Sequence, residues 1–215
     1  MQSLENDIKL ALIKYPSLKR IGQREIKGIF TASQIETGIQ IEDYEVLINF
    51  PSRYPFVFPE VKETSNKIPK NVMRHVFTAS GNLCFGNFVD TLKICKNGIS
   101  LLWFLENILN PHLCREYVKE VTGDYPTGER AHSPEGNWES YYEMLKTKDK
   151  ELILNEIEFA LKSTSIKRNH LCHCGSEKKY KQCHLKIKSA ILEIGFENAM
   201  WLYAYLKNDY ETIKL

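Results

Sequence analysis

The stretch from Tyr44 to Gly86 constrains the fold of this 215-residue chain more than any other part of it. It opens with alternating apolar and polar residues up to Phe50, which predicts a half-buried β-strand. Three prolines within residues 51–59 remove backbone donors and stiffen a turn, and a second strand is expected at 60–64. An irregular segment then leads to a single cysteine, Cys84. The stretch therefore predicts a sheet followed by a loop that carries one thiol.

Helical periodicity borders this stretch on both sides. Apolar residues recur at helical spacing from Ser3, a candidate cap, to Tyr15, which precedes a proline. A broad apolar face between Ile99 and Leu109 predicts a second helix, which Asn110-Pro111 is expected to stop. The strand that ends at Phe50 is expected to span 39–50. Further strands are expected at 24–32 and 75–77, and further helices at 113–121, 137–145, 151–162 and 185–207.

Composition excludes some classes of protein. The most apolar run, residues 99–105, is far shorter than the roughly 20 residues that cross a bilayer, so no membrane partner is expected. Charged residues interrupt the N-terminus, which lacks the apolar core of a secretory signal. Six cysteines without such a signal predict reduced thiols and a cytoplasmic location. The net charge of +2 is too small to name a partner.

The parts of the Tyr44–Gly86 stretch resemble, in order, the centre of the ubiquitin-conjugating enzyme fold. In that family, a strand ending in Phe-Pro precedes Tyr-Pro-Phe-x-x-Pro, a further strand, a histidine and the thioester-forming cysteine. The matching residues are Phe50-Pro51, Tyr54-Pro55-Phe56, Pro59-Glu60-Val61, His75 and Leu83-Cys84. Over residues 1–150, the resemblance implies an α+β fold with an N-terminal helix, an antiparallel meander sheet and C-terminal helices.

The resemblance makes Cys84 a nucleophile that accepts an acyl group as a thioester and passes it to an amine. A thiol suits this task because its thiolate is both a strong nucleophile and a good leaving group. Gly81 and Gly86 would let a bulky donor approach the backbone. The competing interpretation is a small buried apolar residue, since free cysteine is among the most buried residue types.

The chain departs from the family where the amine attacks. Eukaryotic members carry His-Pro-Asn upstream of the cysteine, and this chain has His75-Val76-Phe77. The family asparagine is thought to stabilise the oxyanion; here Asn82 or backbone amides of residues 81–86 are the candidates. In the family, the counterpart of His75 organises the loop by hydrogen bonding, and that role is expected here. His132 lies in a Gly-Glu-x-x-His element like that of bacterial relatives and is a candidate proton acceptor, with an exposed loop histidine as the alternative.

Residues 170–184 closely resemble the SEC-C zinc motif, Cys-x-Cys-Gly-Ser-x-Lys-Lys-(Tyr/Phe)-Lys-x-Cys-(Cys/His). The resemblance implies one structural zinc per chain, whose ligands would be Cys172, Cys174, Cys183 and His184. Three thiolates and one imidazole form a closed tetrahedral set, which is typical of a structural site. His170 and His173 are not expected to be ligands. A segment this short has almost no core, so metal binding must supply its folding free energy.

The domains expected are a ubiquitin-conjugating-like domain at 1–163 and a zinc-binding segment with a closing helix at 164–215. Some bacterial relatives act in antiphage defence, joining the C-terminus of a cGAS-like nucleotidyltransferase to a target. The resemblance therefore implies such a protein, or a ubiquitin-like modifier, as the acyl donor. No nucleotide-binding fingerprint is present, so activation needs a separate activating enzyme, or the acyl donor arrives by another route.

Two other functions compete with the transferase. The first is an inactive ubiquitin-conjugating-like adaptor that recruits partners through the zinc motif; it explains the missing asparagine but not the retained Cys84. The second is a nucleic-acid-binding zinc protein, which rests only on the lysines around the motif. Nucleic acid is not the expected partner, because those lysines belong to the motif itself.

Overall fold

The structure is a computed structural model, and it describes residues 3–126, 135–162 and 167–213. These residues form two compact units. Unit 1 comprises Met1–Gly86 with Asn97–Arg130, and unit 2 comprises Asn87–Lys96 with Ala131–Leu215. Within the described ranges, none of the helices combines the length and apolar content that crossing a lipid bilayer requires.

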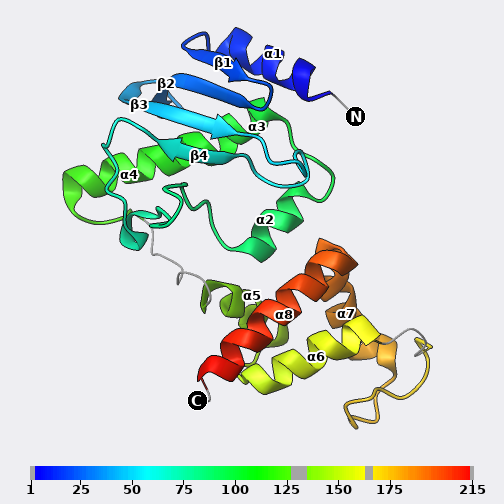
Figure 1. The fold of residues 1–215 in the computed structure, drawn as a ribbon. Helices are drawn as coiled ribbons and strands as arrows, with labels where there is room; N and C mark the ends of the chain where they lie inside the picture. The colour runs from blue at the N-terminus through cyan, green and yellow to red at the C-terminus, as the bar shows by residue number, and fades with distance from the viewer. Residues whose placement is uncertain (1–2, 127–134, 163–166, 214–215) are drawn as a thin grey trace. The chain divides into compact units, whose positions relative to one another are not determined.

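Unit 1 is built on a four-stranded antiparallel sheet with the strand order β1-β2-β3-β4, so each strand pairs with its neighbour in sequence (Figure 1). The strands are β1 Leu18–Gly22, β2 Glu25–Ser33, β3 Gln40–Asn49 and β4 Glu60–Glu63. Helix α1, Leu4–Lys14, precedes them, and the Ser3 side chain caps it by accepting from the Asn6 backbone amide. The predicted N-terminal helix and antiparallel meander are confirmed.

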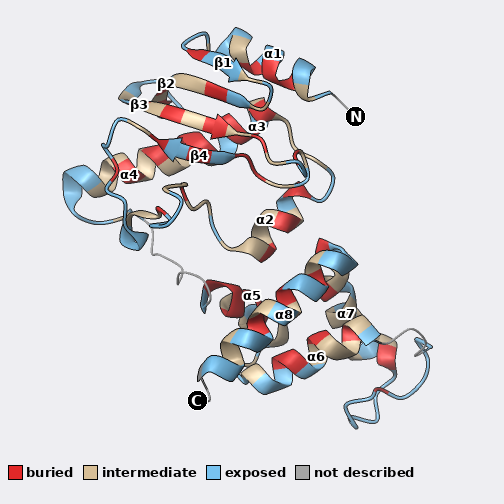
Figure 2. Ribbon diagram, viewed as in Figure 1, coloured by how far each residue is buried: buried red, intermediate tan, exposed pale blue. Residues whose placement is uncertain are grey.

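Strand alternation places the core on one face of the sheet (Figure 2). Tyr44, Val46 and Ile48 of β3 are buried, while the residues between them are more exposed. Ile48 pairs with Ile26 of β2 on one side and with Val61 of β4 on the other, and all three are 0% exposed. The register thus aligns the apolar positions that the alternation had predicted.

Strand β1 was not predicted, because four of its five residues are not buried and its sequence, LKRIG, does not alternate. Tertiary pairing creates it: Leu18 pairs with Gly28 of β2. A Cβ atom at Gly28 would lie 2.1 Å from the Ser17 carbonyl oxygen, so only glycine permits this close approach.

The prediction that Asn110-Pro111 stops the helix was wrong. Helix α3, Leu101–Phe104, continues through a π-helical turn, η2 Leu105–Leu109, into α4, Asn110–Thr122. Proline lacks an N–H and its ring clashes with the carbonyl four residues earlier, and a wider π turn gives the ring room. The Asn110 side chain also pairs with the Ser33 backbone, accepting from its N–H and donating to its carbonyl, both at 2.9 Å.

Unit 2 is helical, with α2 Phe88–Cys95, α5 Glu135–Leu145, α6 Lys150–Lys162, α7 Leu185–Ile191 and α8 Phe196–Ile213. Helix α2 was not predicted. The single closing helix expected at 185–207 is divided by a 3₁₀ turn, η4 Leu192–Ile194, and by Gly195, whose φ of 90° is outside the helical region. Helices α6 and α8 lie side by side (Figure 1).

Packing groups the helices differently from the boundary expected near residue 163. Helices α5 and α6 precede that boundary, yet they pack within unit 2 against α7 and α8. The Phe88 backbone amide of α2 also donates to the Asn137 side-chain oxygen at 3.1 Å, which ties α2 to α5. The division of function between 1–163 and 164–215 stays a prediction.

Candidate functional site

The loop that carries Cys84 is held to the sheet by its backbone. Leu83 donates its N–H to the Val61 carbonyl of β4 at 2.7 Å, and Cys84 donates to the His75 carbonyl at 2.6 Å. Leu83 also forms an isolated antiparallel bridge with Val76. Two residues singled out from the sequence, His75 and Cys84, are therefore brought together through the main chain, 9 positions apart in sequence.

Aromatic packing supports the residue next to Cys84. The Phe85 ring lies 5.3 Å from Phe104 of α3 and 6.3 Å from Phe58, both in edge-on geometry. Its ring is also 5.0 Å from the His112 imidazole of α4. The helix beginning at Leu101 thus supports the thiol loop.

The Cys84 thiol is half-buried, and its Sγ lies 3.7 Å from the Gly86 carbonyl oxygen. Burial raises the pKa of this thiol above its ordinary value, and hydrogen bonding with the Gly86 backbone opposes that rise only in part. No charged group of the described residues contributes to the shift. A nucleophilic step at Cys84 would therefore need a proton acceptor that arrives with a partner or from elsewhere in the chain.

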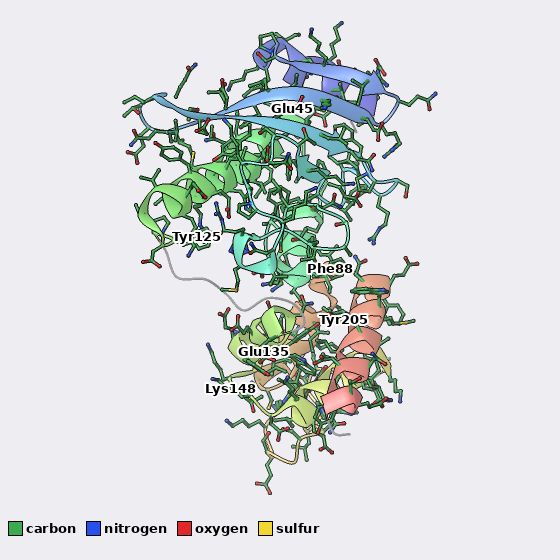
Figure 3. All side chains as sticks on the ribbon, turned by 60° about the vertical axis from the view of Figure 1, so that its left-hand side comes forward. Glu45, Phe88, Tyr125, Glu135, Lys148 and Tyr205 are labelled. Carbon is green, nitrogen blue, oxygen red and sulfur yellow. The ribbon has the colours of Figure 1, made fainter. Side chains whose placement is uncertain are left out.

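His75 sits at the end of a 3₁₀ turn, η1 Val72–Arg74, in the left-handed conformation with φ 49° and ψ 40°. Its ring packs 5.3 Å from Tyr125 and 6.2 Å from His112. Tyr125 follows α4 in the chain (Figure 3). The ring is thus held by packing beside the Cys84 loop. The hydrogen-bonding role expected for His75 stays a prediction.

His112 is a feature that the sequence analysis missed, because Asn110-Pro111 was interpreted as a helix stop. The residue is half-buried, and its Nε2 is buried without a hydrogen-bond partner among the described residues. Burial, with the nearby His75 and Arg115, lowers the pKa of His112 to about 3. It is therefore a neutral imidazole behind the thiol loop at physiological pH. The only signal in the sequence was a histidine two residues after the predicted stop.

A buried ion pair anchors η1 to α4. Arg74 donates from Nε to Glu116 at 2.9 Å, and the Glu116 side chain is 1% exposed. The Tyr125 hydroxyl donates to the other Glu116 oxygen at 2.5 Å. Burial raises the pKa of Glu116, and the bonds from Tyr125 and Arg74 oppose that rise. The loop before Cys84 is thus tied to a helix by charge as well as by packing.

Asn82 and His132 are the two remaining candidate catalytic residues. Asn82 lies in the loop, where its backbone accepts from the Phe77 amide at 2.9 Å and its side-chain oxygen is buried without a hydrogen-bond partner among the described residues. That oxygen is an acceptor, whereas an oxyanion needs a donor, so only the amide nitrogen could serve. His132 lies outside the described residues.

The four predicted metal ligands form a cluster in unit 2. Nδ1 of His184 lies 3.1 Å from Sγ of Cys172 and 3.1 Å from Sγ of Cys183, and Sγ of Cys174 lies 3.6 Å from that of Cys183. All four donor atoms are within 4.8 Å of one another. Gly175 turns the chain after the first pair with φ 72°, and His184 directly precedes α7.

The donor set fits a zinc ion. A tetrahedral zinc with ordinary Zn–S and Zn–N bonds needs donor separations of about 3.5–3.8 Å. The three separations here, 3.1, 3.1 and 3.6 Å, lie within about half an ångström of these values. Three sulfurs and one imidazole nitrogen match the preference of zinc for soft and borderline ligands. The cluster is thus compatible with the expected structural zinc, held by Cys172, Cys174, Cys183 and His184.

Comparison with known proteins supports the metal centre alone. The SEC-C motif matches residues 168–186, which include all four candidate ligands. No curated protein sequence and no solved structure matches the chain. The chain therefore contains a SEC-C zinc-binding motif after a mixed helix-and-sheet region.

Proposed function

We propose that this protein is a ubiquitin-conjugating-like transferase that carries an acyl group as a thioester on Cys84 and passes it to an amine. The observation that carries the proposal is the place of Cys84: a half-buried thiol in a loop pinned to the last strand of an antiparallel meander. An N-terminal helix before that sheet and helices after it agree with the element order of that fold. The assignment to the fold is part of the proposal.

The reaction has two steps. In the first, the Cys84 thiolate attacks the carbonyl carbon of an activated C-terminus, a C–S bond forms, and the activating group leaves with its electron pair. In the second, an amine attacks the thioester, an amide bond forms, and the thiolate leaves. The amine must lose a proton, and the raised pKa of Cys84 makes the departing thiolate a candidate acceptor for it. His132 remains the other candidate named from the sequence.

In this proposal, the zinc motif recruits the partner protein. Its lysines Lys178, Lys179 and Lys186 are exposed, while Tyr180 is 2% exposed and roots the segment in unit 2. We assign to it the docking of a partner protein: a cGAS-like nucleotidyltransferase or a ubiquitin-like modifier, with a separate activating enzyme. This assignment rests on the resemblance and on the motif.

Trapping tests the transferase. The protein is incubated with a candidate donor, ATP and a candidate activating enzyme, and intact mass is measured before and after reduction. Wild type is expected to gain a reducible adduct, Cys84→Ser an ester that resists reduction, and Cys84→Ala nothing. Cys114→Ala is the matched control, because Cys114 is a second half-buried thiol in unit 1. If the adduct persists in Cys84→Ala and vanishes in Cys114→Ala, the proposal fails.

An inactive adaptor is the second candidate. The raised pKa of Cys84 and the inward-facing oxygen of Asn82 favour it, because neither helps a nucleophile or an oxyanion. Comparing wild type with Cys84→Ala distinguishes the transferase from the adaptor. A partner that binds wild type and Cys84→Ala equally well, while neither forms a covalent adduct, would select the adaptor.

A further inference from the structure

A carboxylate from outside the matched motif reaches the back of the metal centre. Glu156 lies on α6, and its Oε1 is 3.4 Å from Nε2 of His184, the ring nitrogen opposite the one that faces the cysteines. The Glu156 side chain is only 11% exposed. Because Glu156 precedes residues 168–186, neither the motif nor its spacing could reveal it.

We infer that Glu156 is the outer-shell carboxylate that orients His184 and sets its tautomer for zinc. An imidazole that binds metal through one nitrogen carries its proton on the other, and a carboxylate beside that N–H holds the ring and raises its basicity. Nδ1 of His184 is 3.1 Å from both Cys172 and Cys183, so Nε2 must be the protonated nitrogen when metal is bound. Glu156 is the group that faces it.

The same carboxylate contacts a second histidine, His173, and so connects the zinc knuckle, residues 168–186, to α6. Glu156 Oε1 is 3.2 Å from Nε2 of His173, and the His173 ring stacks on Phe159, one turn further along α6, at 3.5 Å and 19°. Phe159 also packs edge-on against Tyr180, 6.4 Å away. The outer shell of the metal centre is therefore built by α6, and metal binding stabilises the packing of α6 against the knuckle.

The alternative role for these side chains is a second cation site. Glu156, His173 and His184 form a cluster of three groups that could hold a cation of their own. The Glu156 contacts of 3.2 Å to His173 and 3.4 Å to His184 fit ring N–H groups as well as a shared cation, so distance does not separate the two uses. A His184 ring that binds zinc through Nδ1 carries its proton on Nε2, and that nitrogen then cannot bind a second metal. The outer-shell role follows, with one zinc per chain.

Zinc affinity of the full chain tests the inference. Competition against a chromogenic chelator is expected to give Glu156→Gln a zinc dissociation constant about 10- to 100-fold above that of wild type. Glu158→Gln is the matched control: Glu158 lies on the same helix and pairs with Lys162, and its affinity should match wild type. Cobalt in place of zinc should give the same ligand-field spectrum in Glu156→Gln and wild type, because the four ligands are unchanged.

The background His184→Cys makes the test independent of folding. This variant keeps four zinc ligands but has no imidazole, so adding Glu156→Gln should no longer weaken zinc binding. Helix content by circular dichroism is measured on each zinc-loaded variant. An unchanged zinc dissociation constant in Glu156→Gln would overturn the inference, as would an equal loss in the His184→Cys background. A shifted cobalt spectrum or two zinc ions per chain would make Glu156 a direct ligand and overturn it too.

Discussion

The Cys84 loop of unit 1 and the zinc knuckle of unit 2 both present cysteine, but different forces hold them. The loop depends on packing: Phe85 rests on Phe104, and the buried Arg74–Glu116 pair anchors the turn before it. The knuckle, residues 168–186, has few buried side chains, Cys172 and Tyr180 among them, and depends on four donor atoms meeting at one point.

The two environments shift the pKa values of their thiols in opposite directions at Cys84 and Cys174. At Cys84, burial without a nearby charge raises the pKa, so the thiol keeps its proton. At Cys174, hydrogen bonding with Ser176 lowers the pKa to about 6, so the thiolate is ready for a cation. The lowered pKa suits a metal ligand, but it is a property of Cys174 and not of every candidate ligand, because burial raises the pKa of Cys172.

Removing zinc should have the largest effect of the changes considered, and it should unfold the knuckle while leaving unit 1 folded. Structural zinc supplies about 10–16 kcal/mol to small metal domains, so a chelator should abolish hydrogen-exchange protection in 168–186 while β2 and β3 stay protected. Cys183→Ser should act like the chelator, and Cys84→Ala should keep its zinc. Retained protection in the metal-free knuckle would show that packing, and not metal, holds it.

Arg74→Ala should have the next largest effect, and in unit 1 alone. It leaves Glu116 buried without its cation, a change that costs about 3–5 kcal/mol. Urea denaturation followed by tryptophan fluorescence measures the loss. Lys27→Ala is the control, because its pair with Glu45 is exposed and is expected to contribute about 1 kcal/mol or less. Equal losses in the two variants would contradict a buried anchor.

Acid should weaken unit 1 through His112. Its folded pKa, about 3, is below the ordinary 6.5, so the unfolded chain binds more protons between these values. Stability is fully present above pH 6.5 and falls with pH; by pH 5 the 1.5-unit gap corresponds to about 2 kcal/mol. The unfolding free energy of His112→Gln should fall less over that interval. A curve parallel to wild type would contradict the assignment.

The smallest effect concerns thiol reactivity. At neutral pH, iodoacetamide should modify Cys84 in the folded protein more slowly than in the urea-unfolded protein, because its raised pKa leaves less thiolate. Peptide mass mapping follows the single site, and the rate should climb with pH beyond the point where the unfolded thiol levels off. A faster rate in the folded state would point to an activating group near Cys84.

Prediction from sequence was strongest where the signal is local. Ser3 as a cap, the alternation through Val46 and Ile48, and four ligands within residues 172–184 needed only neighbouring positions. Prediction from sequence failed where residues far apart in the chain determine the local structure. Strand β1 exists because Gly28 lets Leu18 approach, and the helix passes Pro111 through a π turn. Helix α2 is short and packs against α5, which its eight residues alone do not signal.

The sequence by itself determined the candidate zinc ligands, because Cys172 to His184 are close in the chain and a short turn brings them together. Tertiary structure alone decided what surrounds them: Glu156 is 28 positions from His184, and only the packing of α6 on the knuckle makes them neighbours. The same holds for Cys84, which is readable as a candidate nucleophile. Its raised pKa and the lowered pKa of His112 both follow from desolvation, which depends on the whole fold.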